Sequence, residues 1–140
     1  MDLNHLHLHV RDIDRSRDWY GRYFGFREKW RDAHILFIEN DAGFDLALVQ
    51  AETLDPLPTW FHFGFRLADK PAVEAKYRQM PIDRIAEPIE DEGDGKLISF
   101  RVNDPDGYLI EVWLSHRGLL GVSGPGASQR LQRLQHANEQ

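Results

Sequence analysis

The chain has 140 residues with 41% hydrophobic content, which suits one packed domain, and a formal net charge of −6, which argues against nucleic acid as a partner. It contains no cysteine, and no apolar run approaches the roughly 20 residues needed to cross a membrane. The polar start of the chain does not resemble a signal peptide. We therefore expect a soluble cytoplasmic protein, in which any metal site must use His, Asp and Glu.

Residues 2–10 are predicted to form the first strand, because polar and apolar residues alternate along them. His5, His7 and His9 share one face of this strand, and the apolar residues share the other. A solvated edge strand that happens to be rich in histidine is the simple interpretation. A metal site is the alternative, because imidazole is a common metal ligand.

The first half continues with a helix over about residues 15–24, for which Asp14 is the expected N-cap and Gly25 the stop. Three strands are then predicted, at Phe26–Arg31, His34–Glu39 and Phe44–Gln50. The proline-containing segment Thr53–Thr59 reads as a linker.

The second half repeats this order. It opens with a strand at Trp60–Leu67 and a helix that Asp69 caps and that runs to about Met80. The expected elements that follow are a short edge strand at Ile85–Ile89, an acidic loop at Glu90–Gly95, a strand at Lys96–Asn103, a turn at 104–107 and a last strand at Tyr108–Leu114. Both halves are β-α-β-β-β, which indicates an α+β fold. We expect one domain over 1–115, with modules of about 2–52 and 59–115, and a tail over 116–140 that either forms a short helix at Ala127–Glu139 or frays.

Two offsets within the chain support an internal repeat. A shift of 57 positions places His5 on His62, and a shift of 64 places Ala47 on Glu111. Alternation along the last strand puts Glu111 on the same side as the two histidines. If the modules pack about a pseudo-twofold axis, two His and one carboxylate meet as a facial triad with open positions for substrate, suited to Fe, Mn, Ni or Zn.

These residues resemble the vicinal oxygen chelate superfamily, which includes glyoxalase I, extradiol dioxygenases, fosfomycin-resistance enzymes and bleomycin-binding proteins. The resembling segments are 3–12, His62 within 61–65, and 104–111, and the similarity spans about residues 2–115. The resemblance implies paired modules in a half-open mixed barrel around a divalent metal held by His5, His62 and Glu111. Members chelate a substrate through two adjacent oxygens. Small members are often dimers, so we expect a homodimer, with ligands from one chain or two.

Departures from the family narrow the activity. Ala47 stands where glyoxalase I carries a further metal ligand, and Arg101 stands where the fosfomycin enzymes carry a tyrosine. The acid/base residues of extradiol dioxygenases have no clear counterparts, although His7 or His34 could serve. We expect a metal-dependent enzyme of glyoxalase or dioxygenase type with the reaction open. The alternative is a small-molecule (antibiotic) binding or resistance protein, including a fosfomycin-type transferase.

Further site candidates follow from alternation. His7 is the candidate general acid/base or oxygen ligand, because imidazole titrates near neutrality. Arg101 is a candidate catalytic contact for an anionic group, with rim charge as the alternative interpretation. The candidates for substrate binding are His9, Arg66, Ser99 and Trp113.

Overall fold

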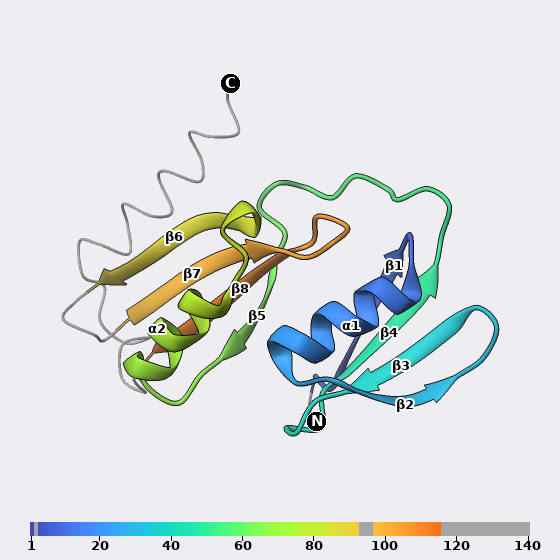
Figure 1. The fold of residues 1–140 in the computed structure, drawn as a ribbon, viewed down its shortest axis with the longest axis horizontal. Coiled ribbons are helices and arrows are strands. Elements are labelled where there is room, and N and C mark those ends of the chain that lie inside the picture. The colour runs from blue at the N-terminus through green and yellow to red at the C-terminus, as the bar shows by residue number, and fades with distance from the viewer. Residues whose placement is uncertain (2, 93–96, 116–140) are drawn as a thin grey trace. The chain divides into compact units, whose positions relative to one another are not determined.

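The structure is a computed structural model that describes residue 1 and residues 3–92 and 97–115 (Figure 1). Its contacts divide the chain into two compact units. The first unit is Met1–Leu57 together with Asn103–Tyr108, and the second is Pro58–Val102 together with the chain from Leu109 onward. The turn that closes the second half of the sequence therefore belongs, by its contacts, to the first unit.

The first unit is a four-stranded mixed sheet with one helix. Its elements are β1 (His5–Val10), α1 (Ile13–Phe24), β2 (Arg27–Arg31), β3 (Ile35–Glu39) and β4 (Asp45–Gln50). The strand order is β1-β4-β3-β2, with β1 parallel to β4 and the other pairs antiparallel. Alternation along the strands buries one apolar face, which forms the core with Tyr20 of α1: Leu8, Val10, Leu36, Ile38, Leu46 and Leu48.

Helix α1 begins two residues earlier than expected. Asp12, and not Asp14, is the N-cap, because its carboxylate accepts a hydrogen bond from the Arg15 backbone N–H at 2.9 Å. The error arises because both residues are acidic and precede the same apolar pattern, and the pattern places a helix boundary only to within a few residues. The predicted stop is confirmed, since Gly25 takes the left-handed conformation with φ of 71°.

The second unit repeats the plan. Its elements are β5 (Phe63–Arg66), α2 (Lys70–Gln79), the single 3₁₀ turn η1 (Ile82–Arg84), β6 (Ile85–Glu92), β7 (Leu97–Asn103) and β8 (Leu109–Ser115). The order is β5-β8-β7-β6, with β5 parallel to β8. Val73 of α2 and its C-cap residue Met80 join the buried face of the sheet, which consists of Ile98, Phe100, Val102, Ile110, Val112 and Leu114. The predicted cap Asp69 is confirmed by its bond from the Ala72 N–H at 2.8 Å.

Two boundaries in the second unit differ from expectation. Strand β5 is shorter than the predicted strand 60–67, so His62 lies just before it. Strand β6 continues to Glu92 through residues expected in a loop, and its pairing with β7 becomes irregular around Pro88, which lacks a ladder donor. Part of the predicted acidic loop and the whole tail with its predicted helix lie outside the described residues.

The internal repeat is present in the backbone geometry. The side-chain oxygen Oδ1 of Asn40 accepts from the N–H groups two and four residues on, and Oδ1 of Asp104 does the same, at 2.9–3.0 Å. Gly43 and Gly107 follow at the same turn position with φ of 76° and 94°. The 64-residue shift therefore relates two copies of one turn.

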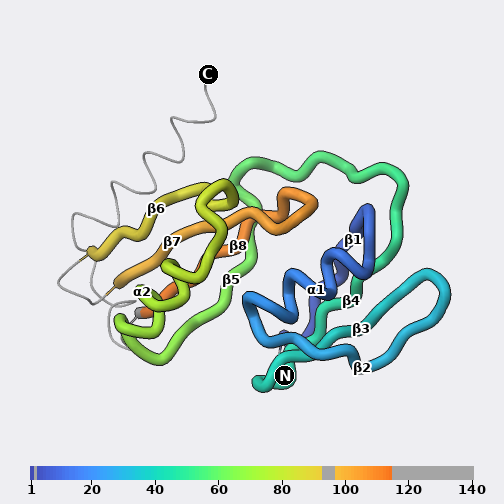
Figure 2. The backbone as a smooth tube through the Cα atoms, viewed as in Figure 1, coloured from blue at the N-terminus to red at the C-terminus, as the bar shows by residue number. Residues whose placement is uncertain are grey.

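The predicted α+β class with two β-α-β-β-β modules is confirmed. Neither four-stranded sheet closes on itself, which agrees with the predicted half-open barrel. Residues 51–62 join β4 to β5 without helix or strand (Figure 2). Within the described part of the chain, no helix is long and apolar enough to cross a membrane.

Candidate functional site

Strand β1 presents its three histidines to solvent, as the alternation predicts. His5, His7 and His9 are exposed, while Leu8 and Val10 between and beyond them are buried. The His7 and His9 rings stand edge to face with centroids 5.6 Å apart. Strand β1 therefore offers a row of solvent-accessible imidazoles on the side of the sheet opposite the core.

Neighbouring strands of the first unit add side chains that the sequence interpretation missed. His5 pairs with Asp45 across the parallel strands. Lys29 lies within 3.1 Å of the carboxylates of both Asp45 and Glu39. Lys29 sits at an irregularity in the β2–β3 pairing, which a strict period of two does not reveal. The charged group beside His5 is thus an acid–lysine cluster.

The side of the sheet opposite the core also carries a pair of aromatic residues, the exposed Trp30 and the partly buried Phe37. Trp30 of β2 lies with its ring centroid 5.9 Å from that of Phe37, and it is one of the exposed large hydrophobic residues of the chain. Phe37 pairs with Ala47, which in turn pairs with His7. The aromatic pair therefore lies in the same cross-strand row as His7, with the buried Ala47 between them.

The second unit brings two of the predicted metal ligands together. His62 Nε2 lies 3.4 Å from Glu111 Oε2, and both side chains are partly buried. His62 Nδ1 lies 3.0 Å from the Trp60 carbonyl oxygen. A carbonyl oxygen only accepts, so Nδ1 carries the hydrogen of this bond, and Nε2 is the ring nitrogen that faces Glu111.

Arg101 is buried beside this pair. Its side chain is 6% exposed, with Nη1 2.8 Å from Glu87 Oε1 and Nη2 3.7 Å from Glu111 Oε1. The sequence analysis allowed that Arg101 could be a charged residue at the rim, whereas the structure buries its side chain. Glu87 was not predicted as a site residue; the signal that reveals it is its strand pairing with Arg101. Ser99, two residues before Arg101, is also buried.

Gly64 makes room for Glu111. The two residues are paired across the parallel strands β5 and β8. A Cβ at Gly64 would lie 2.8 Å from the Glu111 carbonyl oxygen and 3.4 Å from a ring carbon of Trp113. No side chain fits there without a shift of the backbone, so the glycine fixes how closely β5 approaches Glu111.

The donor set fits a divalent metal in its chemistry. His62 and His5 each have Nδ1 engaged by an oxygen, the Trp60 carbonyl and the Asn4 side-chain oxygen at 2.9 Å, so Nε2 is the atom of each ring with which it could coordinate a metal. Among the described residues, no group of three or more His, Cys, Asp or Glu side chains is gathered for a metal. His62 and Glu111 belong to the second unit and His5 to the first.

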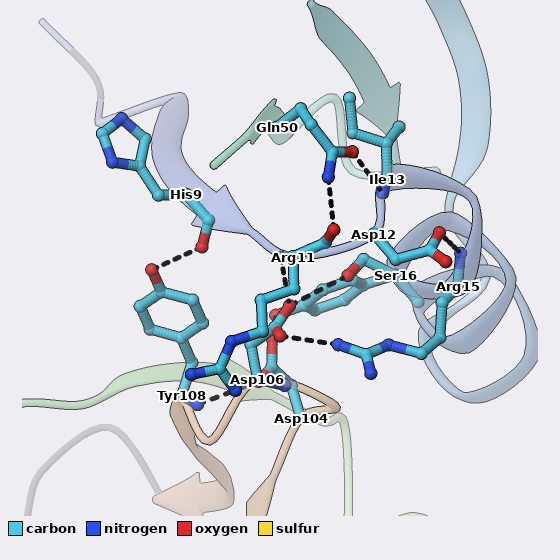
Figure 3. A network of polar contacts seen from close by, with 11 residues as sticks. His9, Arg11, Asp12, Ile13, Arg15, Ser16, Gln50, Asp104, Asp106 and Tyr108 are labelled. Carbon is cyan, nitrogen blue, oxygen red and sulfur yellow. Dashed lines mark hydrogen bonds and ion pairs between the residues drawn. The ribbon is translucent and has the colours of Figure 1, made fainter. Parts of the chain in front are cut away.

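The end of β1 is held by the turn at 103–108 (Figure 3). Asp106 accepts from Arg15 Nη2 at 2.6 Å and from the Arg11 N–H at 3.3 Å, and its carboxylate is fully buried. The Tyr108 hydroxyl donates to the His9 carbonyl oxygen at 2.7 Å. This turn, which leads directly into β8, therefore fixes the backbone at the end of the histidine strand.

A buried hydrogen bond lies beneath this network. The Tyr20 hydroxyl donates to Asp104 Oδ2 at 2.9 Å, and both residues are fully buried. Burial raises the pKa of the Asp104 carboxyl above its ordinary value, although its hydrogen bonds act in the opposite direction. Burial also raises the pKa of Tyr20 well above its ordinary value, so its hydroxyl stays protonated as the donor.

The other predicted site residues are spread over both units. Arg66 and His34 are exposed, and Trp113 is partly buried on β8 beyond Glu111. Their roles, like those of His7, His9 and Ser99, stay predictions.

The fold defines a class of protein: paired β-α-β-β-β modules, each with a mixed four-stranded sheet and one helix. The sequence profile of one family matches most of the chain, over residues 2–112. The chain belongs to the Glyoxalase/Bleomycin resistance protein/Dioxygenase superfamily.

The chain is similar to proteins that are named for different activities. The chain is 28% identical to "Glyoxylase I 4" of Arabidopsis thaliana over 120 residues, which are 79% of this chain and 68% of that protein. A possible glyoxalase from Bacillus cereus superposes with a TM-score of 0.65 at 26% identity, covering 80% of this chain and 97% of that one. A bleomycin resistance determinant encoded on transposon Tn5 superposes with a TM-score of 0.62 at 28% identity, covering 83% and 99%.

Proposed function

We propose that the protein is a metal-dependent enzyme of the vicinal oxygen chelate type, in which His5, His62 and Glu111 hold one divalent ion. The observation that carries the proposal is the His62–Glu111 pair, in which Nε2 and a carboxylate oxygen lie 3.4 Å apart while the Trp60 carbonyl holds the other ring nitrogen. Metal-binding histidines commonly donate their second N–H to such a carbonyl.

In this proposal the ion, Fe, Mn, Ni or Zn, supplies Lewis-acid activation of two adjacent oxygens on a small substrate. His5 joins the centre from the first unit, of the same chain or of a partner in a homodimer. His7 is assigned as the group that takes up or delivers a proton, since it is exposed on the same face of β1 as His5. Substrate contacts are assigned to His9, Arg66, Ser99 and Trp113. A cytoplasmic location completes the proposal.

The test is elemental analysis of protein purified without a metal-affinity tag. We expect near one equivalent of metal in the wild type, and its loss in His62→Ala and Glu111→Gln with the circular dichroism spectrum unchanged. His34→Ala is the control, because it removes an exposed imidazole outside the three predicted ligands. Stoichiometric metal in both ligand variants contradicts the assignment.

A second candidate function is metal-free capture of a small molecule such as an antibiotic. The 28% identity with the Tn5 bleomycin resistance determinant, over nearly the whole of that chain, favours it. A wild type that holds no metal, takes up none on titration and binds bleomycin supports this candidate. Ring cleavage of a catechol by anaerobically iron-loaded protein supports the enzyme, and specifically the dioxygenase branch.

A further inference from the structure

We propose that Arg101 is a positioning residue, whose guanidinium orients the Glu111 carboxylate toward the metal while Glu87 holds Arg101 in place. This inference rests on the proposed metal centre. It differs from the sequence-based expectation, in which Arg101 contacts an anionic substrate.

The two oxygens of Glu111 face different partners. Oε1 lies 3.7 Å from Arg101 Nη2, and Oε2 lies 3.4 Å from His62 Nε2. Because Arg101 attracts Oε1, the carboxylate plane is turned so that Oε2 faces His62 and the proposed metal position. In this arrangement Oε2 is the oxygen of Glu111 that lies beside His62 Nε2.

Arg101 is itself held from the other side. Nη1 donates to Glu87 Oε1 at 2.8 Å, and the two residues are paired across β6 and β7. With 6% of its side chain exposed, the guanidinium is separated from water, and carboxylates on both sides offset its charge. Such a group is not available as an open receptor for a substrate anion, but it is well suited to hold a carboxylate.

Charge and position predict opposite effects on metal affinity. A fixed positive charge near Glu111 repels a cation, so removing it would tighten metal binding if charge were its only effect. If Arg101 positions the ligand, its removal weakens binding, and outer-shell partners of metal ligands typically contribute 10–100-fold in affinity. The sign of the change therefore separates the two roles.

The experiment titrates metal-free protein with Mn²⁺ in a calorimeter and compares Arg101→Gln and Arg101→Lys with the wild type. We expect each variant to bind about 10–100-fold more weakly, because lysine keeps the charge but lacks the planar fork that reaches two carboxylates. Arg78→Gln, which removes an exposed arginine of α2, is the matched control and should bind as the wild type does. Unchanged or tighter binding by Arg101→Gln overturns the proposal.

A crystal structure of metal-free Arg101→Gln supplies a second readout. We expect Glu111 to adopt another rotamer and to lose its 3.4 Å contact with His62. An unchanged contact overturns the positioning role. If the wild type itself binds no metal, the metal centre fails, and the rotamer of Glu111 alone then decides whether Arg101 positions it.

Discussion

Substitution of Tyr20 by phenylalanine tests the buried hydrogen bond in the first unit. The change removes only the hydroxyl that donates to Asp104 at 2.9 Å and keeps the ring, which packs against Trp19 and Phe26. The other carboxylate oxygen of Asp104 keeps its two backbone N–H donors. The loss is therefore that of one hydrogen bond to a buried acceptor.

A hydrogen bond to a charged group contributes about 1.5–3 kcal/mol. We expect Tyr20→Phe to lower the free energy of unfolding by about 2 kcal/mol, which for a domain of this size lowers Tm by roughly 5–10 °C. Urea denaturation followed by tryptophan fluorescence measures it, and the m-value should not change. A loss below about 0.5 kcal/mol would refute the reasoning, because it would mean that the buried Asp104 oxygen gains nothing from its donor.

The pH dependence of the free energy of unfolding tests the same buried hydrogen bond from the side of its acceptor, Asp104. Burial raises the folded-state pKa of Asp104 above the ordinary value of 3.8. The native state therefore holds a proton that the unfolded chain has already lost, and this group's contribution to stability is full below that value and is lost as pH rises through the folded pKa. Asp104→Asn removes the titration and should flatten this part of the profile. Asn40 shows that asparagine accepts the same two backbone bonds in the equivalent turn.

Two further substitutions test local geometry. Asp12→Ala should destabilise the protein by about 1 kcal/mol through loss of the α1 cap. Asp14→Ala removes exposed ion pairs and should cost less than loss of the cap. Equal losses in urea denaturation would contradict the cap assignment. Gly64→Ala should destabilise by about 1–3 kcal/mol, because its Cβ would lie 2.8 Å from the Glu111 carbonyl oxygen, and a stability equal to the wild type would show that β5 moves freely.

Much of the fold was predictable because period-two and helical patterns report burial directly. The buried faces of β1 and β8 follow from alternation, and the internal offsets of 57 and 64 residues correctly relate the capping aspartates and the closing turns. Boundaries were less accurate. His62 lies outside β5, and β6 extends into residues whose acidic composition favoured a loop. Pairing with a neighbouring strand decides such ends, and composition alone does not contain it.

The candidate site was predictable only in part. Alternation places Glu111 and His62 on one face, and the structure brings them within 3.4 Å. The burial of Arg101 and its bond to Glu87 depend on the register of β6 against β7, which a sequence pattern does not fix where a proline interrupts the ladder. Lys29 was not predicted as a site residue because it lies at an irregularity in the β2–β3 pairing, where alternation no longer tells which face a side chain occupies.

The register explains how two copies of one module come to carry different chemistry. In the first unit His7 pairs with Ala47, and in the second the equivalent positions are Gly64 and Glu111. Because a Cβ at Gly64 would meet the backbone of Glu111, the second pair has room for a large side chain only on its closing strand. The first unit places it on the opening strand as an imidazole, and the second places it on the closing strand as a carboxylate. The two modules therefore carry an imidazole and an acid at paired positions, the imidazole opposite Ala47 and the acid opposite Gly64.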